Sequence, residues 1–397
     1  MLSAEISVLI VDDQPANLIL MKHFIGNEGY QIVTAPGGKE ALDELYKQHF
    51  DIVFLDIMMP GMNGIDVLKH IKADPSLMHV YVIMVSAIIE SEELAKALEF
   101  GASDYIKRPI NKIELIARLN AIIRIKRQED ELRFLNEQLE SKNKIISESI
   151  KSASIIQKSL FPRENVLYDT YPGSYIYLKP KSLVSGDFFW IGKNNNREII
   201  IGADCTGHGV AGAMLAIIAN IIINQIVINS EIVDSSEFLR LLNIEYSEAL
   251  NRYNDDIENY LLDGMDISIA IIDRVNDKIS LSAASQNMFV FFKNNTLELL
   301  LGDESSIGYE INGKYVELFS TYEFKLDDIS GFVFYSDGVV DQHGGDSKNT
   351  KFGQAKLKAL LETEGQKDAH ALISRSIKEW QNENSQTDDI LYLSVIL

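Results

Sequence analysis

Short apolar runs alternate with amphipathic stretches over the first part of the chain. Five apolar runs predict strands, and the segments between them show the apolar spacing that is typical of helices. Regular alternation of strands and helices predicts a doubly wound α/β domain with a parallel sheet. The predicted strands are residues 6–11, 30–35, 51–56, 81–87 and 104–107.

Residues 124–160 follow a different pattern and predict one long helix, because they lack Pro and Gly and are rich in charged and polar helix formers. With Ile125 at heptad position a, every a position is apolar, but only two of the five d positions are. This pattern favours a parallel coiled coil of moderate stability, and hence a homodimer. A single amphipathic helix packed on its own domain is the alternative. The a positions are Ile125, Leu132, Leu139, Ile146, Ala153 and Leu160, and the d positions are Gln128, Leu135, Lys142, Ser149 and Ile156.

Residues 209–230 carry no charge and are long enough to cross a bilayer. Asn220, Asn224, Gln225 and Asn229 nevertheless recur at roughly helical spacing, and no Lys or Arg flanks the segment. We therefore expect a buried helix of a globular domain here, and no membrane span.

Composition narrows the classes of function. A chain of 397 residues is longer than most single cores, so more than one domain is expected. The formal net charge of -21 and the lack of a basic stripe argue against nucleic-acid binding. A single Cys excludes an intramolecular disulfide framework, and the first residues have no basic segment before the apolar run, so a cytoplasmic protein is expected.

Three predicted strands of the first domain end in groups with useful chemistry. Asp12 and Asp13 follow the first strand, Asp56 ends the third, and Ser86 ends the fourth. Carboxyl ends of parallel strands meet at one edge of a sheet, where open α/β sheets bind ligands. Three carboxylates at that edge call for a hard cation such as Mg²⁺, and a metal-supported Asp can accept a phosphoryl group. Helix capping and strand termination are the alternative roles.

The motifs VLIVDDQPAN, IVFLDIMMPGMNGIDVLKHIK, VIMVSA and GASDYIKRPI occur in the order and spacing of the response-regulator receiver domain, which residues 5–123 resemble. The resemblance implies that Asp56 is the phosphoacceptor, that Asp12 and Asp13 hold Mg²⁺ with it, and that Ser86 and Tyr105 form the switch. It also implies an upstream sensor histidine kinase.

One position departs from the receiver pattern. The family has Lys directly before the Pro of its last loop, whereas this chain has Arg108 there and Lys107 one residue earlier. Either side chain could supply the positive charge, although a planar guanidinium is not equivalent to an ammonium group.

Acidic residues stand at the ends of short predicted strands after Pro162. Strand ends can bring carboxylates together, and an all-oxygen cluster selects Mg²⁺ or Mn²⁺ over zinc. Two such ions could activate water and hold phosphoryl oxygens. Taken singly, each Asp is more typical of a turn or a helix cap than of a metal site. The acidic residues are Asp187, Asp204, Asp263, Asp266, Asp337, Asp341, Asp388 and Asp389.

Residues 150–397 resemble the metal-dependent protein serine/threonine phosphatases (PPM) of the bacterial branch similar to sporulation stage II protein E. The resemblance rests on the order of the motifs KPKSLVSGDFFW, ADCTGHGVAGAM, DGMDISIAIID, LSAASQN, FYSDGVVDQHGG and TDDILYLSVIL. It implies an α/β/β/α sandwich of two mainly antiparallel sheets, with two Mn²⁺ or Mg²⁺ ions. Under this resemblance the metal ligands are Asp187, Asp204, Asp337, Asp388 and the backbone carbonyl of Cys205, with Asp389, His208, Asp263 and Asp266 near them.

The one Cys is a poor candidate for a nucleophile. Thiol phosphatases need Cys, five residues and then Arg, whereas position 211 is Ala. His208 is a candidate general acid or a structural residue near the metals.

Together the two resemblances imply a receiver at 1–123, a coiled-coil linker at 124–160 and a phosphatase at 161–397. The implied function is hydrolysis of phosphoserine or phosphothreonine on a partner, such as an anti-sigma-factor antagonist of the STAS type, under control of aspartyl phosphorylation. The alternative is a receiver-controlled adaptor with an inactive phosphatase fold that acts by protein binding.

Overall fold

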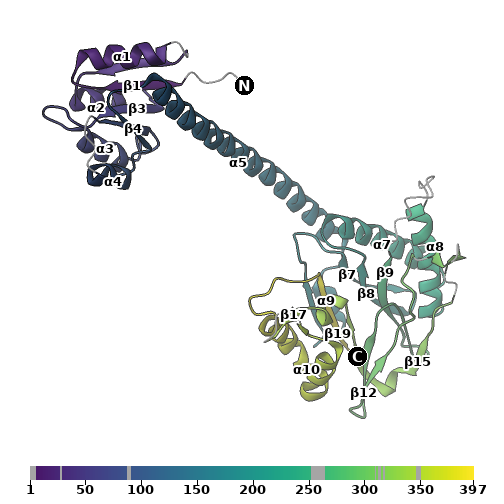
Figure 1. The fold of residues 1–397 in the computed structure, drawn as a ribbon. Coiled ribbons are helices and arrows are strands. Elements are labelled where there is room, and N and C mark those ends of the chain that lie inside the picture. The colour runs from purple at the N-terminus through teal and green to yellow at the C-terminus, as the bar shows by residue number, and fades with distance from the viewer. Residues whose placement is uncertain are drawn as a thin grey trace. The chain divides into compact units, whose positions relative to one another are not determined.

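The chain forms two compact units, residues 1–142 and 143–397, and a single long helix runs from one into the other (Figure 1). This architecture is seen in a computed structural model. The structure describes residues 6–26, 29–86, 91–251, 264–308, 310–311, 314–315, 318–345 and 350–397.

Five parallel strands form the sheet of the first unit: β1 (Ser7–Val11), β2 (Gln31–Ala35), β3 (Ile52–Asp56), β4 (Tyr81–Ser86) and β5 (Asp104–Lys107). Their order is β2-β1-β3-β4-β5. Every residue of the central strand β3 is buried, as its uninterrupted apolar sequence requires in a sheet covered on both faces. Val11 pairs with Leu55, so that β1 and β3 end at the same edge.

Helices cover both faces of this sheet and confirm the predicted α/β fold. One core contains side chains of α2 (Gly38–Lys47), α3 (Gly64–Ala73) and α4 (Ser91–Glu99). The opposite core contains side chains of α1 (Pro15–Ile25) and of the first turns of α5 (Lys112–Leu160).

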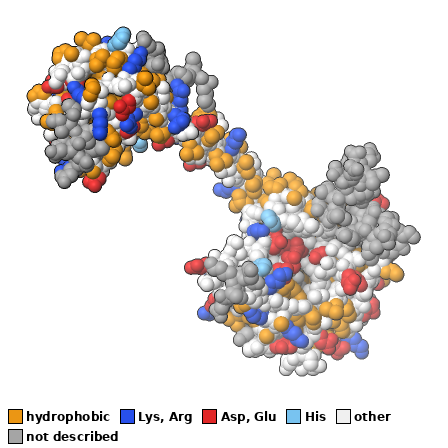
Figure 2. Space-filling model, viewed as in Figure 1, with side chains coloured by type: hydrophobic (Ala, Val, Ile, Leu, Met, Phe, Trp, Pro, Cys, Tyr) orange, Lys and Arg blue, Asp and Glu red, His pale blue; other side chains and the backbone are white. Residues whose placement is uncertain are grey.

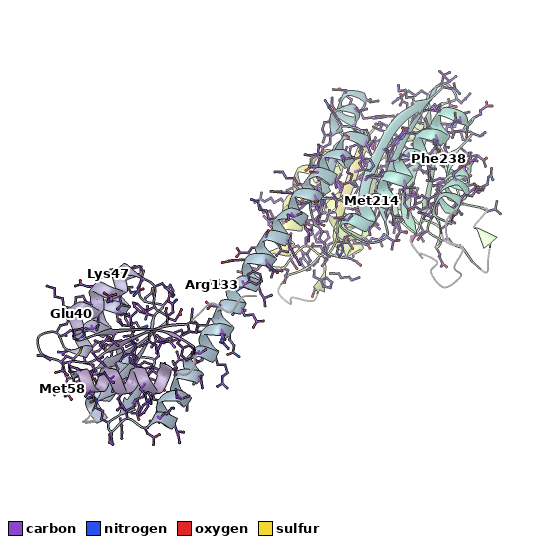
Figure 3. The ribbon with its side chains drawn as sticks, turned by 90° about the horizontal axis from the view of Figure 1, so that it is seen from above. Glu40, Lys47, Met58, Arg133, Met214 and Phe238 are labelled. Carbon is purple, nitrogen blue, oxygen red and sulfur yellow. The ribbon has the colours of Figure 1, made fainter. Side chains whose placement is uncertain are left out.

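The segment predicted as a linker helix, residues 124–160, lies entirely within α5, which begins earlier, at Lys112. Leu115, Leu119 and Ile122 anchor its first turns in the core of the first unit. Farther along, most apolar heptad residues are exposed within the single chain; the exposed ones are Ile125, Leu132, Leu135, Leu139, Ile146, Ile156 and Leu160. Arg133, labelled in Figure 3, lies in this exposed stretch.

Two antiparallel sheets make up the second unit. The first has the order β15-β10-β9-β8-β7 and the second the order β12-β11-β16-β19-β6. The strands are β6 (Tyr175–Lys179), β7 (Asp187–Asn194), β8 (Arg197–Cys205), β9 (Met265–Asp273), β10 (Lys278–Ala284), β11 (Met288–Phe292), β12 (Leu297–Leu300), β15 (Tyr322–Lys325), β16 (Ile329–Tyr335) and β19 (Ile390–Ile396), with the short pairs β13 (Glu310–Ile311) and β14 (Lys314–Tyr315), and β17 (His343–Gly344) and β18 (Thr350–Lys351).

Three apolar cores separate the layers and confirm the predicted α/β/β/α sandwich. The middle core lies between the two sheets. The outer cores lie under α7 (Val210–Asn229) and α8 (Ser235–Asn251) on one side and under α10 (Gln354–Gln381) on the other. The short helices α6 (Glu164–Thr170) and α9 (Asp337–Val340) complete the unit.

The uncharged segment 209–230 forms α7, which packs on β7 and β8. By length and composition, α7 is the one helix among the described residues that could cross a membrane, and half of its most apolar window is buried in this unit. Phe238 of α8 lies in the same core, whereas Met214 of α7 is exposed (Figure 3).

Candidate functional site

The sheet of the first unit brings its acidic residues together as predicted. One carboxylate oxygen from each of Asp12, Asp13 and Asp56 lies within 4.8 Å of the others. Asp12 and Asp56 are buried, and Asp13 is half-buried. Burial raises the pKa of Asp56 to about 6; Arg108 opposes this rise and the charges of Asp12 and Asp13 add to it. Such a cluster fits a divalent cation held by oxygen ligands.

Arg108, and not Lys107, reaches this cluster. Its Nη2 forms ion pairs with Asp12 and, at 3.0 Å, with Oδ1 of Asp56, whereas Lys107 is exposed. The Arg108 N–H donates to the Ser86 carbonyl oxygen at 2.9 Å, which joins the loop after β5 to the end of β4. The guanidinium therefore supplies the positive charge of this edge.

The two predicted switch residues lie on neighbouring strands. Ser86 is buried at the end of β4, and Tyr105 is half-buried on β5. The Arg118 guanidinium lies 5.3 Å from the centre of the Tyr105 ring, and it pairs with Asp104 at 2.6 Å. Arg118 thus links the Tyr105 ring to α5, while the ring packs against the core that contains α2, α3 and α4.

Strand register places three carboxylates side by side in the second unit. Asp187 at the start of β7 pairs with Asp204 near the end of β8, and Asp204 in turn pairs with Asp266 on β9. The other sheet supplies Asp337, which follows β16, and Asp388, which precedes β19. Acidic side chains gather on the face of this unit drawn in Figure 2.

These carboxylates are largely buried, so water screens their mutual repulsion poorly. Burial and the charges of its neighbours raise the pKa of Asp204 well above its ordinary value. Burial likewise raises the pKa of Asp187 to about 8 and that of Asp337 to about 6. Asp187 Oδ2 accepts a hydrogen bond from the Ser336 hydroxyl at 2.6 Å, while its buried Oδ1 has no hydrogen-bond donor within the described part of the chain. A buried oxygen without a partner in an all-carboxylate cluster fits Mg²⁺ or Mn²⁺.

Asp388 and Asp389 lie side by side in the sequence but have different surroundings. Asp389 is 2% exposed, and its two oxygens accept from the main-chain N–H groups of Lys181 at 2.6 Å and Gly186 at 2.7 Å. Asp388 is half-buried, and its charge raises the pKa of Asp337. Asp389 therefore fastens the loop before β7, and Asp388 faces the carboxylate cluster.

The remaining predicted residues divide between core and surface. Cys205 is fully buried, and burial together with the nearby carboxylates raises the pKa of its thiol, which disfavours a thiolate nucleophile. His208 is exposed. Asp266 accepts from the Ser306 hydroxyl at 2.6 Å, and Asp263 lies outside the described residues.

A small polar cavity next to the carboxylates was not foreseen. It has a volume of about 120 Å³ and is lined by Asp266, Asp337, Gln286, Asn287 and Tyr335, among others. The motif LSAASQN contained the two amides, but no sequence signal placed them beside acidic residues from β9 and α9.

Known proteins resemble both units. The family model of the response regulator receiver domain matches residues 8–120, and that of stage II sporulation protein E (SpoIIE) matches residues 194–396. The response regulator PleD of Caulobacter vibrioides is 38% identical over 126 residues, which make up 32% of this chain and 28% of PleD. The sensory transduction protein RegX3 of Mycobacterium tuberculosis is 40% identical over 118 residues, or 30% of this chain and 51% of RegX3. The matched segment thus spans about a quarter to a half of these relatives.

A solved structure shares the fold of the second unit. The SiaA-PP2C domain of Pseudomonas aeruginosa superposes with a TM-score of 0.54 and 24% sequence identity, covering 64% of this chain and 98% of that domain. At this identity the likeness concerns the fold.

Proposed function

Because the chain belongs to the stage II sporulation protein E (SpoIIE) family and carries a response regulator receiver domain, we propose that it is a protein serine/threonine phosphatase controlled by aspartyl phosphorylation. The observation that carries this proposal is the register of Asp187, Asp204 and Asp266 across one sheet, opposite Asp337 from the other sheet. Buried carboxylates repel one another, so their collection at one place is costly unless cations are bound there.

In this proposal two Mg²⁺ or Mn²⁺ ions are held by Asp187, Asp204, Asp337 and Asp388 and by the main-chain oxygen of Cys205. When bound, such ions supply Lewis-acid polarisation of phosphoryl oxygens and lower the pKa of water.

The protein's own groups hold these ligands in place. The Ser336 hydroxyl fixes one oxygen of Asp187. Asp389 fixes the Lys181 and Gly186 main chain in front of β7. The exposed His208 is close in sequence to Asp204 and is a proton donor for the leaving serine or threonine oxygen.

The substrate in this proposal is a phosphoserine or phosphothreonine of a partner protein. By family resemblance this partner is a phosphorylated anti-sigma-factor antagonist of the STAS type.

The receiver provides the control. Asp56 is the phosphoacceptor, and Asp12 and Asp13 hold Mg²⁺ beside it. A phosphoryl group on Asp56 competes for Arg108, which now pairs with Asp56 and Asp12. Because the main-chain N–H of Arg108 is hydrogen-bonded to the Ser86 carbonyl oxygen, a shift of this loop would move the end of β4 as well. The phosphodonor is an upstream sensor histidine kinase.

Helix α5 is the proposed connection between the receiver and the second unit, because side chains of α5 form ion pairs or hydrogen bonds within each unit. In the receiver, Lys126 pairs with Asp51 at 3.1 Å, and the Tyr81 hydroxyl donates to Glu129. In the second unit, Gln157 binds the Ser185 main chain through both atoms of its amide. The exposed apolar heptad residues between these anchors support a homodimer formed along α5.

Phosphate release from a phosphoserine peptide tests the proposal, with wild type and Asp337→Asn measured in Mn²⁺ and in a chelator, with and without acetyl phosphate. Release that requires both Mn²⁺ and Asp337 supports the enzyme, and its response to acetyl phosphate gives the sign of control. If neither the peptide nor a phosphorylated antagonist is hydrolysed, the proposal fails and binding without catalysis replaces it.

A further inference from the structure

The cavity beside the carboxylate cluster is lined by an amide of which only one end has a hydrogen-bond partner in the described part of the chain. Gln286 is only 6% exposed, and its Oε1 accepts a hydrogen bond from the Ser268 hydroxyl of β9 at 3.1 Å. Its Nε2 is buried and has no acceptor among the described residues, yet Gln286 lines the cavity together with Asp266 and Asp337. A buried donor without an acceptor costs free energy, and a ligand that accepts a hydrogen bond from this N–H would offset that cost.

The backbone around Gln286 is held in an unusual conformation. Ser285 has a φ of 59°, in the left-handed region that residues other than glycine rarely adopt. Behind it, a Cβ on Gly302 would lie 2.1 Å from the Gln286 carbonyl oxygen, so the two main chains are in close contact. The Gly302 N–H also donates to Asn287 Oδ1 at 3.3 Å. This turn is thus rigidly built, and it directs the amide into the cavity.

The other lining groups define what the cavity accepts. Gln354 Nε2 donates to the Tyr335 hydroxyl oxygen at 3.0 Å, which leaves the hydroxyl proton able to donate elsewhere. No Lys or Arg is found among the described residues that line the cavity, and two carboxylates border it. An anionic group of the substrate, other than its phosphate, would therefore be repelled from this cavity. A volume of about 120 Å³ is large enough for several waters or for one small uncharged group.

We propose that Gln286 is a substrate-positioning residue, whose amide N–H donates to a carbonyl oxygen of the partner protein next to its phosphoserine. This inference rests on the proposed phosphatase function and extends it, because the metal ligands alone recognise any phosphate ester. A hydrogen bond from Gln286 to the carbonyl oxygen of the residue next to the phosphoserine favours a phosphoserine within a polypeptide over a small phosphate ester. The carbonyl belongs to the main chain or to a neighbouring Asn or Gln, and the substrates below distinguish the two.

The test compares wild type with Gln286→Met, which keeps the volume and removes the amide, and with Gln286→Glu, which keeps the shape and removes the donor. Three substrates are used: an aryl phosphate, a phosphoserine peptide flanked by alanines, and one flanked by asparagines. We expect the ratio of peptide to aryl phosphate activity to fall about threefold to tenfold, mainly through KM, as the loss of one hydrogen bond predicts. A fall with both peptides identifies a main-chain carbonyl, and a fall only with the second identifies a side-chain carbonyl. Gln381→Met is the matched control, because this amide bonds Asn384 at the end of α10 and lies outside the cavity lining.

Binding decides the question without turnover. Fluorescence anisotropy of the alanine-flanked and asparagine-flanked phosphopeptides is measured with Asp204→Asn and with Asp204→Asn/Gln286→Met. A threefold to tenfold rise in Kd for either peptide in the double variant supports the inference. An unchanged Kd for both, or an unchanged activity ratio, overturns it. If wild type releases no phosphate from any of the three substrates, the phosphatase proposal is refuted instead. The binding comparison would then still test the role of Gln286.

Discussion

Gln157 offers the sharpest test of how α5 is joined to the second unit. Its side chain is 5% exposed; Nε2 donates to the Ser185 carbonyl oxygen at 2.6 Å, and Oε1 accepts from the Ser185 N–H at 3.2 Å. The next residue, Gly186, donates its N–H to Asp389, and Asp187 follows. One glutamine of α5 therefore holds the main chain that leads into the carboxylate cluster.

Replacement by alanine removes both hydrogen bonds and leaves the buried Ser185 main chain without these partners. At about 0.5–1.5 kcal/mol for each bond, Gln157→Ala should destabilise the second unit by about 1–3 kcal/mol. For a unit of this size that corresponds to a fall in Tm of about 2–4 °C per kcal/mol. Gln138→Ala is the matched control, because Gln138 is exposed on the same helix and should change the free energy of unfolding by less than about 0.5 kcal/mol.

The assay combines urea denaturation with phosphate release in the presence and absence of acetyl phosphate. If α5 carries the signal, Gln157→Ala should reduce the response to acetyl phosphate, whereas Gln138→Ala should retain it. The reasoning is wrong if Gln157→Ala unfolds within 0.5 kcal/mol of wild type and responds fully to acetyl phosphate.

Three further predictions concern other contacts. Arg108→Ala removes a cation that competes for the receiver carboxylates, so Mg²⁺ should bind about tenfold more tightly by calorimetry; weaker binding would contradict the role assigned to the guanidinium. Burial raises the pKa of Asp51, but a hydrogen bond from a main-chain N–H and the nearby Lys126 outweigh burial and hold this pKa below its ordinary value of 3.8. The stability that the Asp51–Lys126 pair contributes is therefore fully present above pH 3.8 and is lost as the pH falls through the lowered pKa of Asp51. Lys126→Met should therefore cost about 1 kcal/mol in urea denaturation at pH 7 and less at pH 3.5, and a difference that grows on acidification would oppose this account. Gly338→Ala would place a Cβ 1.8 Å from the Asp389 carbonyl oxygen, so we expect a Tm at least 5 °C lower, and an unchanged Tm would show that α9 and the segment before β19 are not so closely packed.

Much of the fold could be predicted from local patterns. Runs of apolar residues at strand and helix periods predicted the parallel sheet of the first unit and a long helix, the resemblance carried by the later motifs implied a sandwich of antiparallel sheets, and the structure confirms both folds. Motif order also predicted the two families. These features are carried by neighbouring residues, which is why one sequence sufficed. The roles of the individual site residues stay predictions.

Contacts between distant segments decided the rest. The sequence left open whether Lys107 or Arg108 serves the receiver, and only the path of the loop after β5 brings the guanidinium to Asp56. Asp388 and Asp389 are adjacent and chemically identical, but only Asp389 meets the main-chain N–H groups of the segment before β7. Gln286 meets the carboxylate cluster because β9 pairs with both β8 and β10. Such pairings depend on strand register and on burial across the sandwich, and no local pattern of residues encodes either.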